Sequence, residues 1–92
     1  MTNLDIAWES VENEGPGIYN EAYLANFRKL LLIAEKDGIS VSINFFQSAP
    51  AWAKNSQIEK DTLYGHYKAA FDHTQRRLKN CKAVTCFRLN EP

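Results

Sequence analysis

Residues 39–46 read ISVSINFF, and this stretch decides the fold. Apolar side chains occupy every odd position, while the even positions hold two serines, an asparagine and a phenylalanine. In an extended chain, successive side chains point to opposite faces, so this period of two predicts a β-strand with one buried face. The segments on either side of this strand determine what kind of sheet it joins.

A helix is predicted on each side of this strand. Before it, Asn20 can cap a helix over residues 21–37, and Gly38 can end that helix. After it, Asp61 or Thr62 can cap a second helix. Both helices carry apolar side chains at helical spacing on one face. The residues on these faces are Leu24, Phe27, Leu30, Leu31 and Ala34 in the first helix, and Leu63, Tyr67, Ala70, Phe71, Thr74 and Leu78 in the second.

Two further strands are predicted at residues 4–11 and 83–89, which gives the order β-α-β-α-β. Strands joined by helical crossovers pair in parallel with right-handed connections. The sequence therefore predicts an α/β fold with three parallel strands and two helices on one side. One face and both edges of this sheet would be bare, so we expect self-association through the sheet edges.

Composition limits the classes of function. A chain of 92 residues forms one domain at most, and its 45% hydrophobic content is that of a globular chain. Eleven basic residues balance eleven acidic ones, which argues against nucleic acid or a membrane surface as partner. No apolar run approaches the roughly 18 residues of a transmembrane segment, so the chain as given is expected to be soluble. Cys81 and Cys86 are interpreted as reduced packing residues.

The dipeptide Asn90-Glu91 follows the third predicted strand. Catalytic groups of parallel α/β barrels lie at such carboxyl ends of strands. Retaining glycosidases use two carboxyl groups about 5 Å apart, and Glu91 is the one well-placed candidate for the acid/base. The Asn90 amide could hydrogen-bond a sugar hydroxyl. The alternative is a strand that simply ends in polar turn residues before Pro92.

Several short motifs occur in an order that resembles family 5 glycoside hydrolases. Within that family, the chain looks most like the branch of endoglycoceramidases and the related glucosylceramide and steryl β-glucosidases. The likeness covers nearly the whole chain apart from the middle loop. The motifs are WESVE at 8–12, EGPGIYN at 14–20, GISV at 38–41, HY at 66–67, AAF at 69–71, RRL at 76–78, NCKAV at 80–84 and NEP at 90–92.

The resemblance implies that residues 1–92 are part of a (β/α)8 TIM-barrel domain, carrying strands two to four from its N-terminal half. Glu91 would then take the acid/base position, with Asn90 as its companion. The implied activity is hydrolysis of a β-glucoside or a glycolipid-like substrate by a retaining mechanism, without a cofactor. The implied partner is a carbohydrate or glycolipid substrate.

The resemblance also suggests which other residues bind substrate, and where the chain departs from the family. Trp8 would lie near the barrel mouth or be a plain core residue. Trp52, in the long loop 47–60, could stack on a sugar or lipid or simply pack on the surface. Gln47 matches the family pattern, whereas Asn44 and Phe46 stand where the family usually has Asp and His. A phenylalanine can neither donate nor accept a hydrogen bond.

The family's nucleophilic Glu follows a later strand and has no counterpart in these residues, so the isolated chain is expected to be inactive. One alternative is a non-catalytic, truncated or degenerate sugar-binding or interaction protein, and another is a small α/β binding module unrelated to hydrolases. No metal site is expected, because His66 and His73 lack a third ligand. The acidic residues Glu9, Glu12 and Glu14 are interpreted as a solvated loop.

Overall fold

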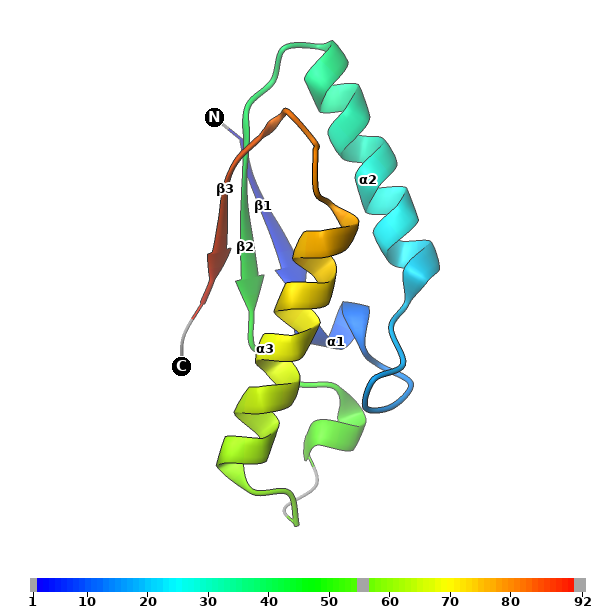
Figure 1. The fold of residues 1–92 in the computed structure, drawn as a ribbon, viewed down its shortest axis with the longest axis vertical. Helices are drawn as coiled ribbons and strands as arrows, with labels where there is room; N and C mark the ends of the chain where they lie inside the picture. The colour runs from blue at the N-terminus through cyan, green and yellow to red at the C-terminus, as the bar shows by residue number, and fades with distance from the viewer. Residues whose placement is uncertain (1, 55–56, 91–92) are drawn as a thin grey trace.

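The computed structural model describes residues 2–54 and 57–90. Three strands alternate with helical segments along these residues (Figure 1). The elements in chain order are β1 Thr2–Ala7, α1 Trp8–Val11, α2 Glu21–Lys36, β2 Val41–Phe46, the 3-10 helix η1 Ala51–Lys54, α3 Lys60–Arg77 and β3 Val84–Leu89. No helix within the described part of the chain is long and apolar enough to cross a membrane.

The three strands form one parallel sheet in the order β1-β2-β3. In Figure 1 the long helices α2 and α3 lie on the same side of this sheet. Both features confirm the predicted α/β arrangement. The one irregularity in the pairing follows Val41, which pairs with Val84, because the next pair is Ser42 with Cys86. The extra residue, Thr85, donates its hydroxyl to the Val41 carbonyl at 3.2 Å.

The core lies between the sheet and the helices. Ile43 and Phe45 of β2 are fully buried, as predicted from their alternation. They meet the buried faces of α2 and α3, where Leu31 and Tyr67 are also fully buried. The opposite face of the sheet carries Asn44 and the other even-numbered side chains of β2, and no helix of the described residues covers it (Figure 1).

The first strand is shorter than predicted. It ends at Ala7, and residues 8–11 form the one-turn helix α1 instead of continuing the strand. The helical turn brings Glu12, four residues after Trp8 in the sequence, next to the indole ring. The indole Nε1 donates to the Glu12 carboxylate at 2.7 Å. This contact between residues four apart requires a helical backbone, which the apolar composition of the segment did not reveal.

The ends of α2 follow the prediction closely. The Asn20 side chain accepts a hydrogen bond from the Tyr23 amide at 3.0 Å and so caps the helix. Gly38 follows the helix with φ +70°, a conformation that favours glycine. By contrast, α3 begins at Lys60 with Glu59 as its N-cap, slightly before the predicted cap at Asp61 or Thr62.

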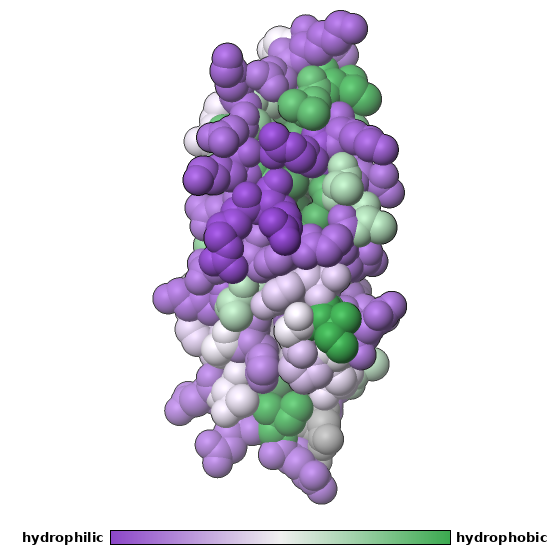
Figure 2. Space-filling view, turned by 45° about the vertical axis from the view of Figure 1, so that its right-hand side comes forward, coloured by the Kyte–Doolittle hydropathy of each residue, from purple (hydrophilic) through white to green (hydrophobic). Residues whose placement is uncertain are grey.

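The outer side of α2 is more apolar than the sequence pattern suggested. Leu30 was expected to widen the buried stripe, yet it is 48% exposed, and Ile33 beside it is 58% exposed. Figure 2 shows apolar side chains gathered on the upper part of this face, over the C-terminal half of α2. Leu30 faces away from the core because Leu24 and Leu31 already occupy the positions nearest the sheet.

Candidate functional site

The carboxyl ends of all three strands meet at one edge of the sheet, the lower edge in Figure 1. Ala7 at the end of β1 pairs with Phe46 at the end of β2, and Phe45 pairs with Leu89. The Glu9 amide then donates to the Ser48 carbonyl at 2.8 Å, which ties α1 to the segment after β2. The segments that sequence reasoning selected as strand ends therefore lie together.

Tyr67 anchors the end of β3 to this edge. Its hydroxyl, on a fully buried ring of α3, lies 2.8 Å from the Phe45 carbonyl and 2.7 Å from the Asn90 carbonyl, which share its one proton. The Asn90 amide also donates to the Phe45 carbonyl at 2.8 Å. The backbone of Asn90 is thus fixed on both sides, while its side chain is exposed. Sequence reasoning counted Tyr67 only as part of an apolar stripe, although a buried tyrosine hydroxyl needs a partner.

Glu12 is a second residue whose role sequence reasoning missed. It is 1% exposed, so the prediction that it belongs to a solvated loop is wrong. Its carboxylate accepts hydrogen bonds from Trp8 Nε1 at 2.7 Å and from the Gly17 amide at 2.6 Å, and its carbonyl accepts from Trp52 Nε1 at 2.6 Å. A buried carboxylate is tolerated when donors satisfy both of its oxygens. The clue was the spacing of four between Trp8 and Glu12.

The two tryptophans pack against each other beside this carboxylate. Trp8 is fully buried, so the structure corresponds to the alternative of a core residue and leaves its indole no free surface for a sugar. Trp52, in η1, is partly exposed and meets Trp8 edge to face, with ring centroids 5.8 Å apart. The His66 ring also packs edge to face on Trp52, with ring centroids 5.3 Å apart. Trp52 is therefore the tryptophan that retains accessible surface at the strand ends.

A polar hollow opens on the uncovered face of the sheet, next to these strand ends. It has a volume of about 480 Å³, and Asn44, Phe46 and Asn90 lie in its wall. Asp5 and Arg88 flank Asn44 on the neighbouring strands. The structure thus brings the predicted residues Asn44 and Asn90 to one hollow. Gln47 follows β2 directly and is half-buried, while Glu91 lies outside the described residues.

A cluster around Glu21 links the loop before α2 to α3. His73 Nε2 lies 3.0 Å from one Glu21 carboxylate oxygen, and Arg77 Nε donates to the other at 3.0 Å. The ring of Tyr19 stacks on the ring of His73, with the ring centroids 4.0 Å apart. The hydrogen bond from Arg77 lowers the pKa of Glu21, while burial raises the pKa of Tyr19. His73 thus contacts both Glu21 and Tyr19.

The other sequence-derived expectations concern the cysteines and a metal. Cys81 is buried, Cys86 is half-buried, and both are free, as predicted. Within residues 2–54 and 57–90, no group of three His, Cys, Asp or Glu side chains is arranged to hold a metal ion.

Comparison with known proteins finds similarity to a curated protein and to a solved structure, and no protein-family model matches the chain. The chain is 36% identical over 56 residues to a Glucosylceramidase from Rhizopus delemar, which is 61% of this chain and 8% of that protein. The fold is similar to the crystal structure of a GH5_18 from Bifidobacterium longum subsp. infantis. The TM-score is 0.74 and the sequence identity 16%, over 92% of this chain and 23% of that one. The chain is thus similar in sequence to part of a glucosylceramidase and similar in fold to part of a family 5 glycoside hydrolase.

The similarity in fold explains the bare face of the sheet. The three strands and their helices are a β-α-β-α-β portion of a (β/α)8 TIM barrel, as predicted, and the uncovered face corresponds to the inside of the barrel. The hollow beside Asn44 and Asn90 opens on this inner face, at the carboxyl ends of the strands. Active sites of TIM-barrel enzymes are built at these ends.

Proposed function

We propose that these residues form part of the active site of a retaining glycoside hydrolase, in which Glu91 is the acid/base. The observation that carries the proposal is the double anchoring of Asn90 by Tyr67 and Phe45 at the end of β3. These contacts fix the backbone of Asn90, the residue that precedes Glu91 in the sequence. General acid/base groups need such positioning, because proton transfer requires heavy-atom distances of about 3 Å.

In the proposed mechanism, Glu91 protonates the glycosidic oxygen while a second carboxylate attacks the anomeric carbon and the bond to the leaving group breaks. Glu91, now deprotonated, then takes a proton from the water that hydrolyses the glycosyl-enzyme intermediate. We assign the nucleophile to no residue of this chain. The 92 residues, as part of one barrel domain, are therefore expected to be inactive alone.

The proposed substrate is a β-glucoside with a lipid-like aglycone. The name of the Rhizopus delemar relative, Glucosylceramidase, supports a glycolipid. Asn90 and Asn44 border the polar hollow and offer amide groups to sugar hydroxyls, with Gln47 next to them in sequence. Trp52 is partly exposed and offers an aromatic surface to a sugar or lipid, while the buried Trp8 supports it from behind.

A second candidate function is sugar binding without catalysis. It is favoured by Phe46, which lines the hollow where the resemblance leads us to expect a histidine. An aromatic ring there removes a hydrogen-bonding group from the polar wall. Under this proposal, a soluble β-glucoside binds to the chain and is not hydrolysed.

An assay of hydrolysis distinguishes catalysis from binding alone. The assay uses the full-length protein that contains these residues, with an aryl β-glucoside and with glucosylceramide as substrates. If Glu91 is the acid/base, Glu91→Gln lowers the rate roughly 10²- to 10⁴-fold. Glu14→Gln, which removes an equal charge from an exposed position, leaves the rate unchanged.

Two outcomes of this assay would contradict the proposals. An unchanged rate in Glu91→Gln would exclude Glu91 as the acid/base. Hydrolysis by the 92 residues alone that disappears in Glu91→Gln would refute their inactivity in isolation.

A further inference from the structure

The outer side of α2 carries an apolar surface that faces away from the sheet. Leu32 is 45% exposed and Ile33 is 58% exposed, whereas Leu31, directly before them, is fully buried. An α-helix has 3.6 residues per turn, so Ile33 lies roughly opposite Leu31 and points away from the core. In a TIM barrel the helices form the outer ring, and neighbouring helices lie beside one another. The outward side of α2 therefore stays on the surface of a barrel of this fold.

Two exposed lysines flank these apolar side chains on the same side of the helix. Lys29 precedes Leu32 by three residues and Ile33 by four. Lys36 follows the same two residues by four and by three. Residues three and four apart are neighbours on a helix surface, so each lysine adjoins both apolar side chains. In Figure 2, hydrophilic side chains border the apolar group on α2. We call Lys29, Leu32, Ile33 and Lys36 the outer face of α2.

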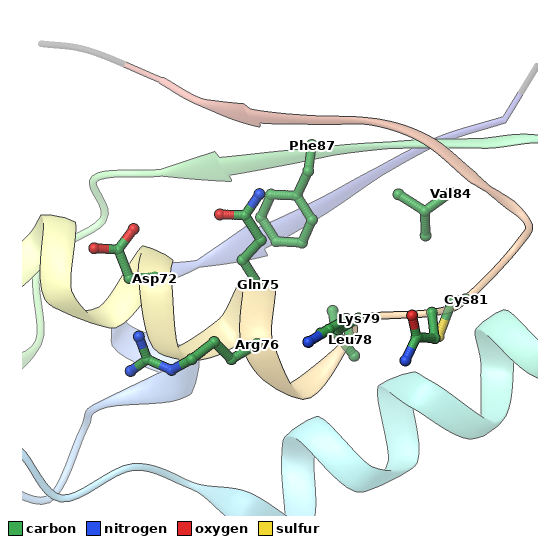
Figure 3. A pocket seen from close by; sticks show the side chains of 9 residues that line it. Asp72, Gln75, Arg76, Leu78, Lys79, Cys81, Val84 and Phe87 are labelled. Carbon is green, nitrogen blue, oxygen red and sulfur yellow. The ribbon is translucent and has the colours of Figure 1, made fainter.

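Further cations lie at the end of α3, beside α2. Arg28 Nη1 donates to the Lys79 carbonyl at 2.9 Å, which holds the segment after α3 against α2. Figure 3 shows Arg76 and Lys79 at this end of α3, and both are exposed. The cations at the end of α3 therefore add to the positive charge of the outer face of α2.

The neutral net charge of the whole chain conceals this local excess of cations. The nearest carboxylates in the α2 sequence are Glu35, which is half-buried, and Asp37, which follows the helix as its C-cap. Asp72 is the carboxylate that lies near Arg76. Exposed aliphatic side chains between lysines are typical of helices that lie on a membrane surface and are attracted by anionic lipids. The overall charge thus does not decide against a membrane surface as partner of this face.

The size of the apolar surface also indicates the kind of partner. A stable interface between two proteins buries about 800 Å² on each of them, around an apolar centre. The two aliphatic side chains Leu32 and Ile33 are too few to form such a centre. Binding to a membrane combines a small buried apolar area with electrostatic attraction, and both contributions are present on this face.

We propose that the outer face of α2 binds the surface of a membrane that contains anionic lipids. Leu32 and Ile33 enter the boundary between the lipid headgroups and the acyl chains, while Lys29 and Lys36 contact the lipid phosphates. The choice of a membrane rests in part on the proposed function, because the proposed glycolipid substrate lies in a membrane. Binding of this kind would hold a glycolipid hydrolase at the surface that carries its substrate.

The test measures binding of the full-length protein that contains these residues to lipid vesicles, by sedimentation and without glycolipid. We expect tighter binding to phosphatidylcholine vesicles with about one-third phosphatidylserine than to phosphatidylcholine alone, and a loss of this difference at high salt. Absence of binding, or equal binding to both vesicles at low salt, would overturn the proposal. Because no substrate is present, such a failure would leave the proposed role of Glu91 untouched.

Charge reversals locate the binding surface. Lys29→Glu with Lys36→Glu should weaken binding to the mixed vesicles roughly 25-fold or more, since each basic residue at an anionic surface contributes about fivefold in affinity. Lys60→Glu with Lys68→Glu makes the same charge change at exposed positions of α3 and should have a much smaller effect. Equal weakening by the two pairs would overturn the assignment to α2.

The apolar contribution is tested separately. Leu32→Gln with Ile33→Gln should weaken binding roughly tenfold, because two aliphatic side chains no longer leave water. Ile18→Gln, at another exposed aliphatic position, should leave binding unchanged, and an unchanged Tm shows that the variants are folded. Unchanged binding in the double variant would overturn the proposal. Lipid-free dimers that this variant abolishes would also overturn it and would identify a second copy as the occupant of the face.

Discussion

At the scale of single residues, Glu12 is a buried carboxylate that joins two segments of the chain. Its carboxylate satisfies both Trp8 Nε1 and the Gly17 amide in a buried environment. Glu12→Gln replaces one acceptor oxygen by a donor, which leaves one of the two partners unpaired and should cost about 1–3 kcal/mol of unfolding free energy. Urea unfolding, followed by the fluorescence of the two tryptophans, measures this loss. The control is Glu9→Gln at an exposed position, and equal stability of the two variants would refute the prediction.

Tyr67 acts through its hydroxyl. Tyr67→Phe keeps the ring in the core but removes the donor to the Asn90 and Phe45 carbonyls, and we expect a loss of about 1–2 kcal/mol. Hydrogen exchange at the Asn90 amide should accelerate more than exchange in α2, because the end of β3 loses its anchor. Tyr19→Phe is the control, since Tyr19 meets His73 through its ring. Equal acceleration in both variants would contradict a local anchoring role.

At the scale of elements, the contact between the start of α2 and the end of α3 depends on pH. The hydrogen bond from Arg77 lowers the pKa of Glu21 below its ordinary value of 4.5 in the folded chain. A carboxyl whose pKa is lowered by folding adds stability that is complete above its ordinary pKa and is lost as the pH falls through the folded pKa. The effect is small because both side chains are about half exposed.

Thermal unfolding between pH 7 and pH 3 tests this dependence. Glu21→Gln should flatten the decline in Tm below pH 4.5, whereas Glu14→Gln should keep it. If Tm falls equally with pH in the unchanged chain and in Glu21→Gln, groups other than Glu21 cause the loss of stability in acid.

At the scale of the whole molecule, the sheet formed by the described residues has two unpaired edges and one uncovered face. Unpaired strand edges favour pairing with other chains, so we expect the 92-residue chain to self-associate with rising concentration. Sedimentation velocity over a hundredfold concentration range measures this. A monodisperse monomer with one cooperative melting transition would contradict the prediction.

The sequence by itself determined the order of the three strands and the two long helices, the direction of the strands and most of the core. Alternation over residues 39–46 identified β2, and the Asn20 cap and Gly38 located the ends of α2. These features are local, because they depend on backbone geometry and on neighbours a few residues away. Parallel pairing followed from the helical crossovers, since connectivity limits how such strands can pair.

The tertiary structure alone decided which side chains act together. Glu12 appeared solvated in the sequence because its acidic neighbours are, yet it is buried, and Trp52, 40 residues away, donates to its carbonyl. Tyr67 appeared to be a packing residue until the ends of β2 and β3 were brought to its hydroxyl. Hydrogen bonds between distant segments depend on how whole elements pack, and neither periodicity nor capping patterns encode that packing.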